Sequence, residues 1–79
     1  MNERQKELVR GWEVSRKVAK NIAADLAIGI DAGRIRDVPD TGDITGEWIV
    51  SPRTAQSAKK LLGDAGILKK DKTRRYYIP

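Results

Sequence analysis

The most informative segment of the sequence is SPRTAQSAKKLLGDAGIL, residues 51–68. It opens on Ser51-Pro52, a hydroxyl side chain that can cap a helix, followed by proline at the first helical position. Gly66 closes the segment, and glycine is a common helix terminator. We therefore predict a helix over residues 52–65, with alanines at the front of its apolar side and leucines at the back.

The polar face of this predicted helix is suited to contact with DNA. It carries Arg53, Gln56, Ser57 and Lys60, whose spacing follows the helical turn. Arginine can pair with guanine and glutamine with adenine in the major groove. The alternative interpretation of the same residues is a helix surface that only meets solvent.

A basic β-hairpin is expected over residues 67–78. Ile67-Leu68 opens a strand, a charged turn follows, and the segment 74–78 returns. Cationic side chains on such a hairpin can lie along phosphates or enter the minor groove. Those of this hairpin are Lys69, Lys70, Lys72, Arg74 and Arg75.

An apolar stripe indicates a longer helix upstream. Its residues recur every four positions, at Val18, Ile22, Leu26 and Ile30. We place the N-cap of this helix at Ser15 and its end at Gly33. Residues 1–14 are then a polar helical arm, and residues 15–79 form the main domain.

Two short elements are expected between these helices. Residues 34–38 are predicted to be extended, because Pro39 disfavours helical backbone in the residue before it. A short helix around residues 42–48 can be capped by Asp40 or Thr41.

Composition excludes several classes of protein. The 79 residues include no histidine and no cysteine, which removes zinc fingers, disulfide frameworks and Ser-His-Asp or Cys-His catalysis. No nucleophile–base pair can be assembled, so we expect no enzyme, no cofactor and no metal site. The net charge is +5, and residues 51–79 alone hold eight basic and two acidic residues. A polyanionic partner is therefore expected at this last third of the chain.

The order of helix, short strand, short helix, capped helix and basic hairpin is typical of a winged helix-turn-helix, a mainly α fold with a small β-hairpin. The segment VSPRTAQSAKKLLGDAGIL, residues 50–68, resembles the recognition-helix region of the GntR family of bacterial repressors. Pro39 stands eleven residues before Val50, as the corresponding proline does in that family. The resemblance covers residues 15–79, with Ile49 where the family usually has the glycine of the helix-turn-helix turn.

The resemblance implies a recognition helix in the major groove and a wing on the minor groove or the DNA backbone. The contacting first turns then contain Ser51, Arg53, Thr54 and Gln56, with Ser57 and Lys60 further along. The wing contacts come from Lys69, Lys70, Lys72 and Arg74. GntR regulators also carry a C-terminal ligand-binding domain, so this chain is either a self-standing small regulator or one domain of a longer one.

We therefore expect a cytoplasmic, sequence-specific double-stranded DNA-binding transcriptional regulator, a repressor that binds an inverted repeat as a homodimer. Leu8, Val9 and Trp12 are the candidate dimer surface. The polar N-terminus contains no apolar targeting segment, and no contact with a membrane is expected. Two alternatives stay open: an architectural or excisionase-like DNA-binding accessory protein, and a winged-helix module that binds an acidic protein.

Overall fold

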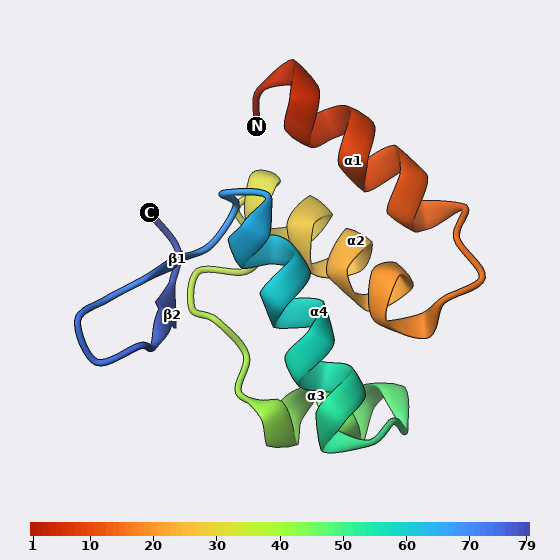
Figure 1. Cartoon of the computed structure of the whole chain (residues 1–79), viewed down its shortest axis with the longest axis vertical. Helices are drawn as coiled ribbons and strands as arrows, with labels where there is room; N and C mark the ends of the chain where they lie inside the picture. Colours follow the sequence, from red (N-terminus) through yellow and green to blue (C-terminus); the bar gives the residue numbers. More distant parts are fainter.

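A computed structural model covers residues 1–79 and shows four helices followed by one two-stranded antiparallel sheet (Figure 1). The elements are α1 (Glu3–Glu13), α2 (Val18–Asp31), α3 (Thr41–Trp48), α4 (Pro52–Asp64), β1 (Lys69–Lys70) and β2 (Tyr76–Tyr77). The expected mainly helical chain with a small hairpin is thus confirmed. No helix combines the length and the apolar character needed to cross a bilayer.

The core lies around α2, which packs against α1 on one side and α4 on the other (Figure 1). Ile22 of α2 and Leu62 of α4 are completely buried. Ala55 and Ala58 of α4 are also completely buried, and their small side chains let the two helices approach closely. The predicted apolar side of α4, small at the front and large at the back, is therefore the side that meets α2.

Helix α1 belongs to the same core. Val9 and Trp12 are only 3% and 6% exposed and pack into the common hydrophobic cluster. Their side chains are consequently not available as the dimer surface that we expected, and only Leu8 of the three lies on the outside. Asn2 and Gln5 form a reciprocal capping box that fixes the start of α1.

The start of α2 differs from the prediction. The helix begins at Val18, with Lys17 at the N-cap, rather than directly after Ser15. The side chain of Asn21 donates hydrogen bonds to the carbonyl oxygens of Trp12 and Ser15, both at 2.9 Å. These bonds hold the chain between α1 and α2 in a turn, and therefore delay the helix.

The predicted end of α2 is confirmed at Gly33, whose φ of 76° takes the chain out of the helix. The extended segment expected over 34–38 does not form a strand. A strand needs a hydrogen-bonded neighbour, and the two hairpin strands pair only with each other. Ile35 and Val38 instead pack their side chains against the core.

Of the two caps expected for α3, Asp40 is the one formed: its carboxylate accepts a hydrogen bond of 2.7 Å from the backbone N–H of Asp43. The helix ends at Trp48, and its C-cap, Ile49, has left-handed backbone (φ 53°, ψ 56°) and is 90% exposed. A β-branched residue is strained in this region. The chain then turns directly into α4.

Helix α4 has the predicted N-cap: the Ser51 hydroxyl accepts a hydrogen bond of 3.3 Å from the backbone N–H of Thr54. The helix ends at Asp64, one residue before the predicted end, because Ala65 forms the C-cap ahead of Gly66. Ile67 and Leu68 are buried in the core and precede the sheet rather than forming its first strand, since β1 begins only at Lys69.

The hairpin pairs Lys69 with Tyr77 and Lys70 with Tyr76. As expected for alternating strand residues, Tyr76 packs against the core while Tyr77 is 43% exposed. Figure 1 shows the hairpin on the side of α4 and α2 that faces away from α1.

Candidate nucleic-acid interface

Helix α4 presents its polar side as a ridge with an open groove on each flank. Arg53 and Lys60 lie along the top of the ridge, seven residues apart on one face. Gln56 lines the groove on one flank and Ser57 the groove on the other. Lys60 lines both grooves. A ridge of polar side chains between two depressions is the shape that a helix needs to enter the major groove of a duplex.

The larger depression, which we call the hairpin groove, separates α4 from the β-hairpin and has a volume of about 690 Å³. Five basic side chains line it, and Asp40 is the one acidic residue among its walls. The basic residues are Lys59 and Lys60 from α4 and Lys70, Arg74 and Arg75 from the hairpin. This concentration of positive charge makes the hairpin groove suitable for an anionic polymer.

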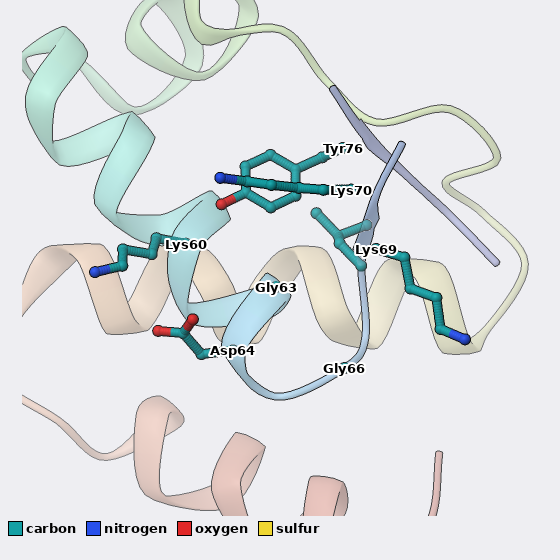
Figure 2. A pocket seen from close by; sticks show the side chains of 8 residues that line it. Lys60, Gly63, Asp64, Gly66, Lys69, Lys70 and Tyr76 are labelled. Atoms are coloured by element: carbon teal, nitrogen blue, oxygen red, sulfur yellow. The ribbon is translucent and has the colours of Figure 1, made fainter. Parts of the chain in front are cut away.

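The wall of this groove depends on a close contact between the hairpin and α4. The Lys70 ammonium lies 4.9 Å from the centre of the Tyr76 ring, a cation–π geometry. A Cβ added to Gly63 would lie 2.7 Å from Cε1 of the same ring, so only glycine at this position admits the tyrosine. Figure 2 looks into a neighbouring pocket of about 480 Å³ between the end of α4 and the hairpin, and shows Lys70 and Tyr76 extending together toward α4, while Lys69 extends the other way.

The two adjacent lysines of α4 differ in their surroundings. Partial burial lowers the pKa of Lys59, and the carboxylates of Asp40 and Asp43 act against that shift. Lys60 is exposed on the ridge. Lys60 is therefore the lysine of this pair whose charge is most accessible to a ligand.

The turn of the hairpin is held by one carboxylate. Oδ1 of Asp71 accepts hydrogen bonds from the Thr73 hydroxyl (2.7 Å), the Thr73 backbone N–H (2.8 Å) and the Arg75 backbone N–H (3.0 Å). The Thr73 hydroxyl, followed by the Arg75 amide, holds the pKa of Asp71 below its ordinary value. Arg74, between them, has left-handed backbone with φ 62°. This fixed turn determines where the basic residues of the hairpin point.

The basic residues of segment 51–79 form no ion pair within the chain. The structure contains two ion pairs, one between the N-terminal ammonium and Asp31 and one between Lys6 and Glu3. Neither involves any of the eight basic residues of segment 51–79. Carboxylates act on two of them without forming an ion pair, Asp40 and Asp43 on Lys59 and Asp71 on Arg75. The excess of positive charge that is left favours an external polyanion.

The structure brings together only some of the predicted site residues. Gln56, Lys60, Lys70 and Arg74 line the hairpin groove, and Ser57 lies on the other flank of α4. Ser51 and Thr54 hydrogen-bond to each other at the helix cap. Arg53 is exposed near that cap. Lys69 does not line the hairpin groove, but it lines the neighbouring pocket together with Lys60 and Lys70. Lys72 is exposed and lines neither.

Several basic residues near α4 were not predicted from the sequence as contact residues. Lys59 lines the hairpin groove although it was not predicted as a contact residue. Arg75 also lines it; it was expected among the cationic residues of the hairpin but not among the wing contacts that the resemblance implies. Lys17 and Lys20, at the start of α2, line the groove on the opposite flank of α4 together with Ser57 and Lys60. No local signal places these two lysines there, because their position follows from the packing of α2 on α4.

The sequence matches no protein-family model, and comparison with curated proteins and with solved structures gives no match.

Proposed function

We propose that this chain is a double-stranded DNA-binding transcriptional regulator, a repressor with a winged helix-turn-helix fold. In this proposal α3 and α4 are the helix-turn-helix, α4 enters the major groove, and the β-hairpin is the wing. The proposal rests on one observation: the polar ridge of α4 borders a groove lined by five basic side chains, none of which has an acidic partner within ion-pair distance.

The ridge supplies the groups that read bases. Arg53 and Gln56 are exposed in the first two turns of α4, the end of a recognition helix that meets base edges in helix-turn-helix proteins. Arginine and glutamine can each make two hydrogen bonds to one base, which discriminates against the wrong base by about 1–3 kcal/mol. The same end of the helix carries the positive pole of its dipole, which favours a nearby phosphate.

The groove supplies affinity. Each phosphate neutralised by a lysine or arginine releases counterions, so binding weakens as salt rises. Side chains from both walls of the hairpin groove can hold one DNA strand between α4 and the wing. The resemblance of residues 50–68 to GntR repressors supports a regulatory role for this arrangement.

Fluorescence anisotropy with a short random duplex tests this proposal. We expect binding that weakens between about 50 and about 200 mM salt, with a slope that reflects the number of phosphate contacts. The Lys60→Ala variant should bind about 8-fold more weakly at 0.1 M salt, the loss of one contact. Lys59→Ala is the matched control and should lose less, since Lys59 is partly buried beside Asp40 and Asp43. Absence of binding at low salt by the folded protein would contradict the proposal.

Sequence specificity has a separate test. Selection from a random duplex library should enrich one sequence motif. The Arg53→Ala variant should lose the base preference at one position of that motif, while its affinity for nonspecific DNA changes far less than its affinity for the motif. Binding without an enriched motif, with a footprint that extends over adjacent sites, would instead indicate the architectural role.

A further inference from the structure

The groove on the second flank of α4 has no role in the function proposed above. We call it the α2 groove; its volume is about 400 Å³ and its walls come from the start of α2 and the middle of α4. Lys17 and Lys20 stand on one wall, and Ser57 and Lys60 on the other. Asp64, toward the end of α4, is its acidic residue.

These lysines have no partner of their own. Neither forms an ion pair, and the side chain of Lys17 makes no hydrogen bond at the N-cap that it occupies. Asn21 fixes the turn that precedes them through hydrogen bonds to two backbone carbonyls. The fold therefore holds two free ammonium groups beside α4, on the flank away from the hairpin.

We infer that the α2 groove binds the second sugar–phosphate backbone of the duplex, with Lys17 and Lys20 as its phosphate contacts. This inference rests on the proposed function. A helix that enters the major groove is flanked by a phosphate backbone on each side, since the groove is about 12 Å wide. On this chain each flank of α4 carries its own depression and its own lysines. Lys60 stands between them on the ridge and lines both.

This arrangement predicts that the chain prefers double-stranded to single-stranded DNA. The hairpin groove can hold one backbone whether or not the second strand is present. The α2 groove adds contacts only when a second backbone runs along the other side of α4. Removing its lysines should therefore affect duplex binding selectively.

The test is the double variant Lys17→Ala/Lys20→Ala, titrated by fluorescence anisotropy against a random duplex and a single strand of the same length. Loss of two phosphate contacts reduces duplex affinity at 0.1 M salt by about 60-fold and makes the salt slope shallower by about 1.8. Affinity for the single strand should stay within about 3-fold of wild type, the residual effect of net charge. The double variant Lys17→Arg/Lys20→Arg should restore duplex binding.

A charge-matched control is Lys6→Ala/Arg10→Ala, which removes two positive charges from a face of α1 that lines neither groove. Its duplex affinity should stay within about 3-fold of wild type, the same residual effect of net charge, and circular dichroism should show all variants folded. The variant Lys70→Ala/Arg74→Ala separates the two proposals, because it should weaken binding to duplex and single strand alike.

Three outcomes overturn the inference. If the hairpin variant weakens duplex binding but Lys17→Ala/Lys20→Ala does not, the α2 groove is no DNA site and the proposed function stands. Equal losses on duplex and single strand contradict the assignment to the second backbone. If the wild type itself binds no DNA, the proposed function fails and the inference fails with it.

Discussion

Replacing Arg74 by glycine should stabilise the fold while weakening DNA binding. Arg74 has a φ of 62°, a left-handed conformation that costs a side-chain-bearing residue about 1–2 kcal/mol. Glycine adopts it freely but adds about 0.4–1 kcal/mol of conformational entropy to the unfolded chain. The difference favours the folded Arg74→Gly variant by about 1 kcal/mol, a rise in melting temperature of about 4–8 °C for a chain of this length.

The same substitution removes a charge from the hairpin groove. Loss of one phosphate contact reduces affinity at 0.1 M salt by about 8-fold and makes the salt slope shallower by about 0.9. The turn itself should persist, because the backbone N–H of residue 74 still donates to the Asp71 carbonyl, at 3.0 Å in the present structure. Stability and affinity are thus predicted to change in opposite directions.

Thermal unfolding by circular dichroism and fluorescence anisotropy with a random duplex measure the two effects. Arg74→Ala keeps the strain and loses the charge, so it should bind weakly without gaining stability. Arg74→Lys keeps both and should resemble the wild type. A lower melting temperature for Arg74→Gly would refute the strain argument, and unchanged affinity for both uncharged variants would refute a phosphate contact at this residue.

Three further predictions concern stability. Ile49→Gly should raise stability by about 1 kcal/mol in urea unfolding, because glycine relieves the strain of the left-handed backbone. Ile49→Ala should change stability little, because the 90% exposed side chain buries almost no apolar surface. Equal effects of the two substitutions would contradict strain at this turn. In α3, the new Cβ of Gly46→Ala would meet no atom within 4 Å, so this substitution should stabilise the chain by about 0.5–1 kcal/mol. Gly63→Ala should destabilise it, because the new Cβ would lie 2.7 Å from the Tyr76 ring. Higher stability of both variants in urea unfolding would contradict the close packing of hairpin and α4. The pKa of Asp71 is lowered in the folded chain, so its stabilisation of the turn is complete above the ordinary aspartate pKa and disappears as pH falls through the folded value. The NMR signal of the Thr73 amide should therefore titrate with a midpoint below 3.8, and a midpoint at or above that value would show that the turn does not hold the carboxylate.

Local signals in the sequence were sufficient for the start of α4 and for the exits from α2 and α4. Ser51 followed by Pro52 marks the start of α4 because a hydroxyl cap and a proline at the first position both act within one turn. Gly33 and Gly66 mark exits from helices because both adopt positive φ. These features depend on neighbours in the chain and can be predicted without knowing the tertiary structure.

The errors concern features that depend on a hydrogen-bond partner outside the segment itself. Ser15 has the chemistry of an N-cap, but the Asn21 side chain donates to the carbonyl oxygens of Trp12 and of Ser15 itself, and α2 begins at Val18. Residues 34–38 resemble a strand, yet the hairpin offers them no hydrogen-bonding edge. A pattern of residue types cannot report whether such a partner is present.

In the candidate site, too, the residues that follow a local pattern were predicted, and those placed by tertiary packing were missed. Gln56 and Lys60 were predicted from the helical period and Lys70 from the hairpin pattern, and all three line the hairpin groove. Lys17 and Lys20 were missed because they reach α4 only through the packing of α2 against it. In a chain this basic, sequence alone does not separate the lysines beside the ridge from those elsewhere.

The most direct measurement is an NMR titration of the ¹⁵N-labelled protein with a random DNA duplex. We expect salt-sensitive amide shifts concentrated on the ridge of α4 and on the hairpin, with the outer face of α1 unchanged. Shifts confined to α1, or no shifts at low salt, would contradict the claim that α4 and the hairpin form a DNA-binding surface.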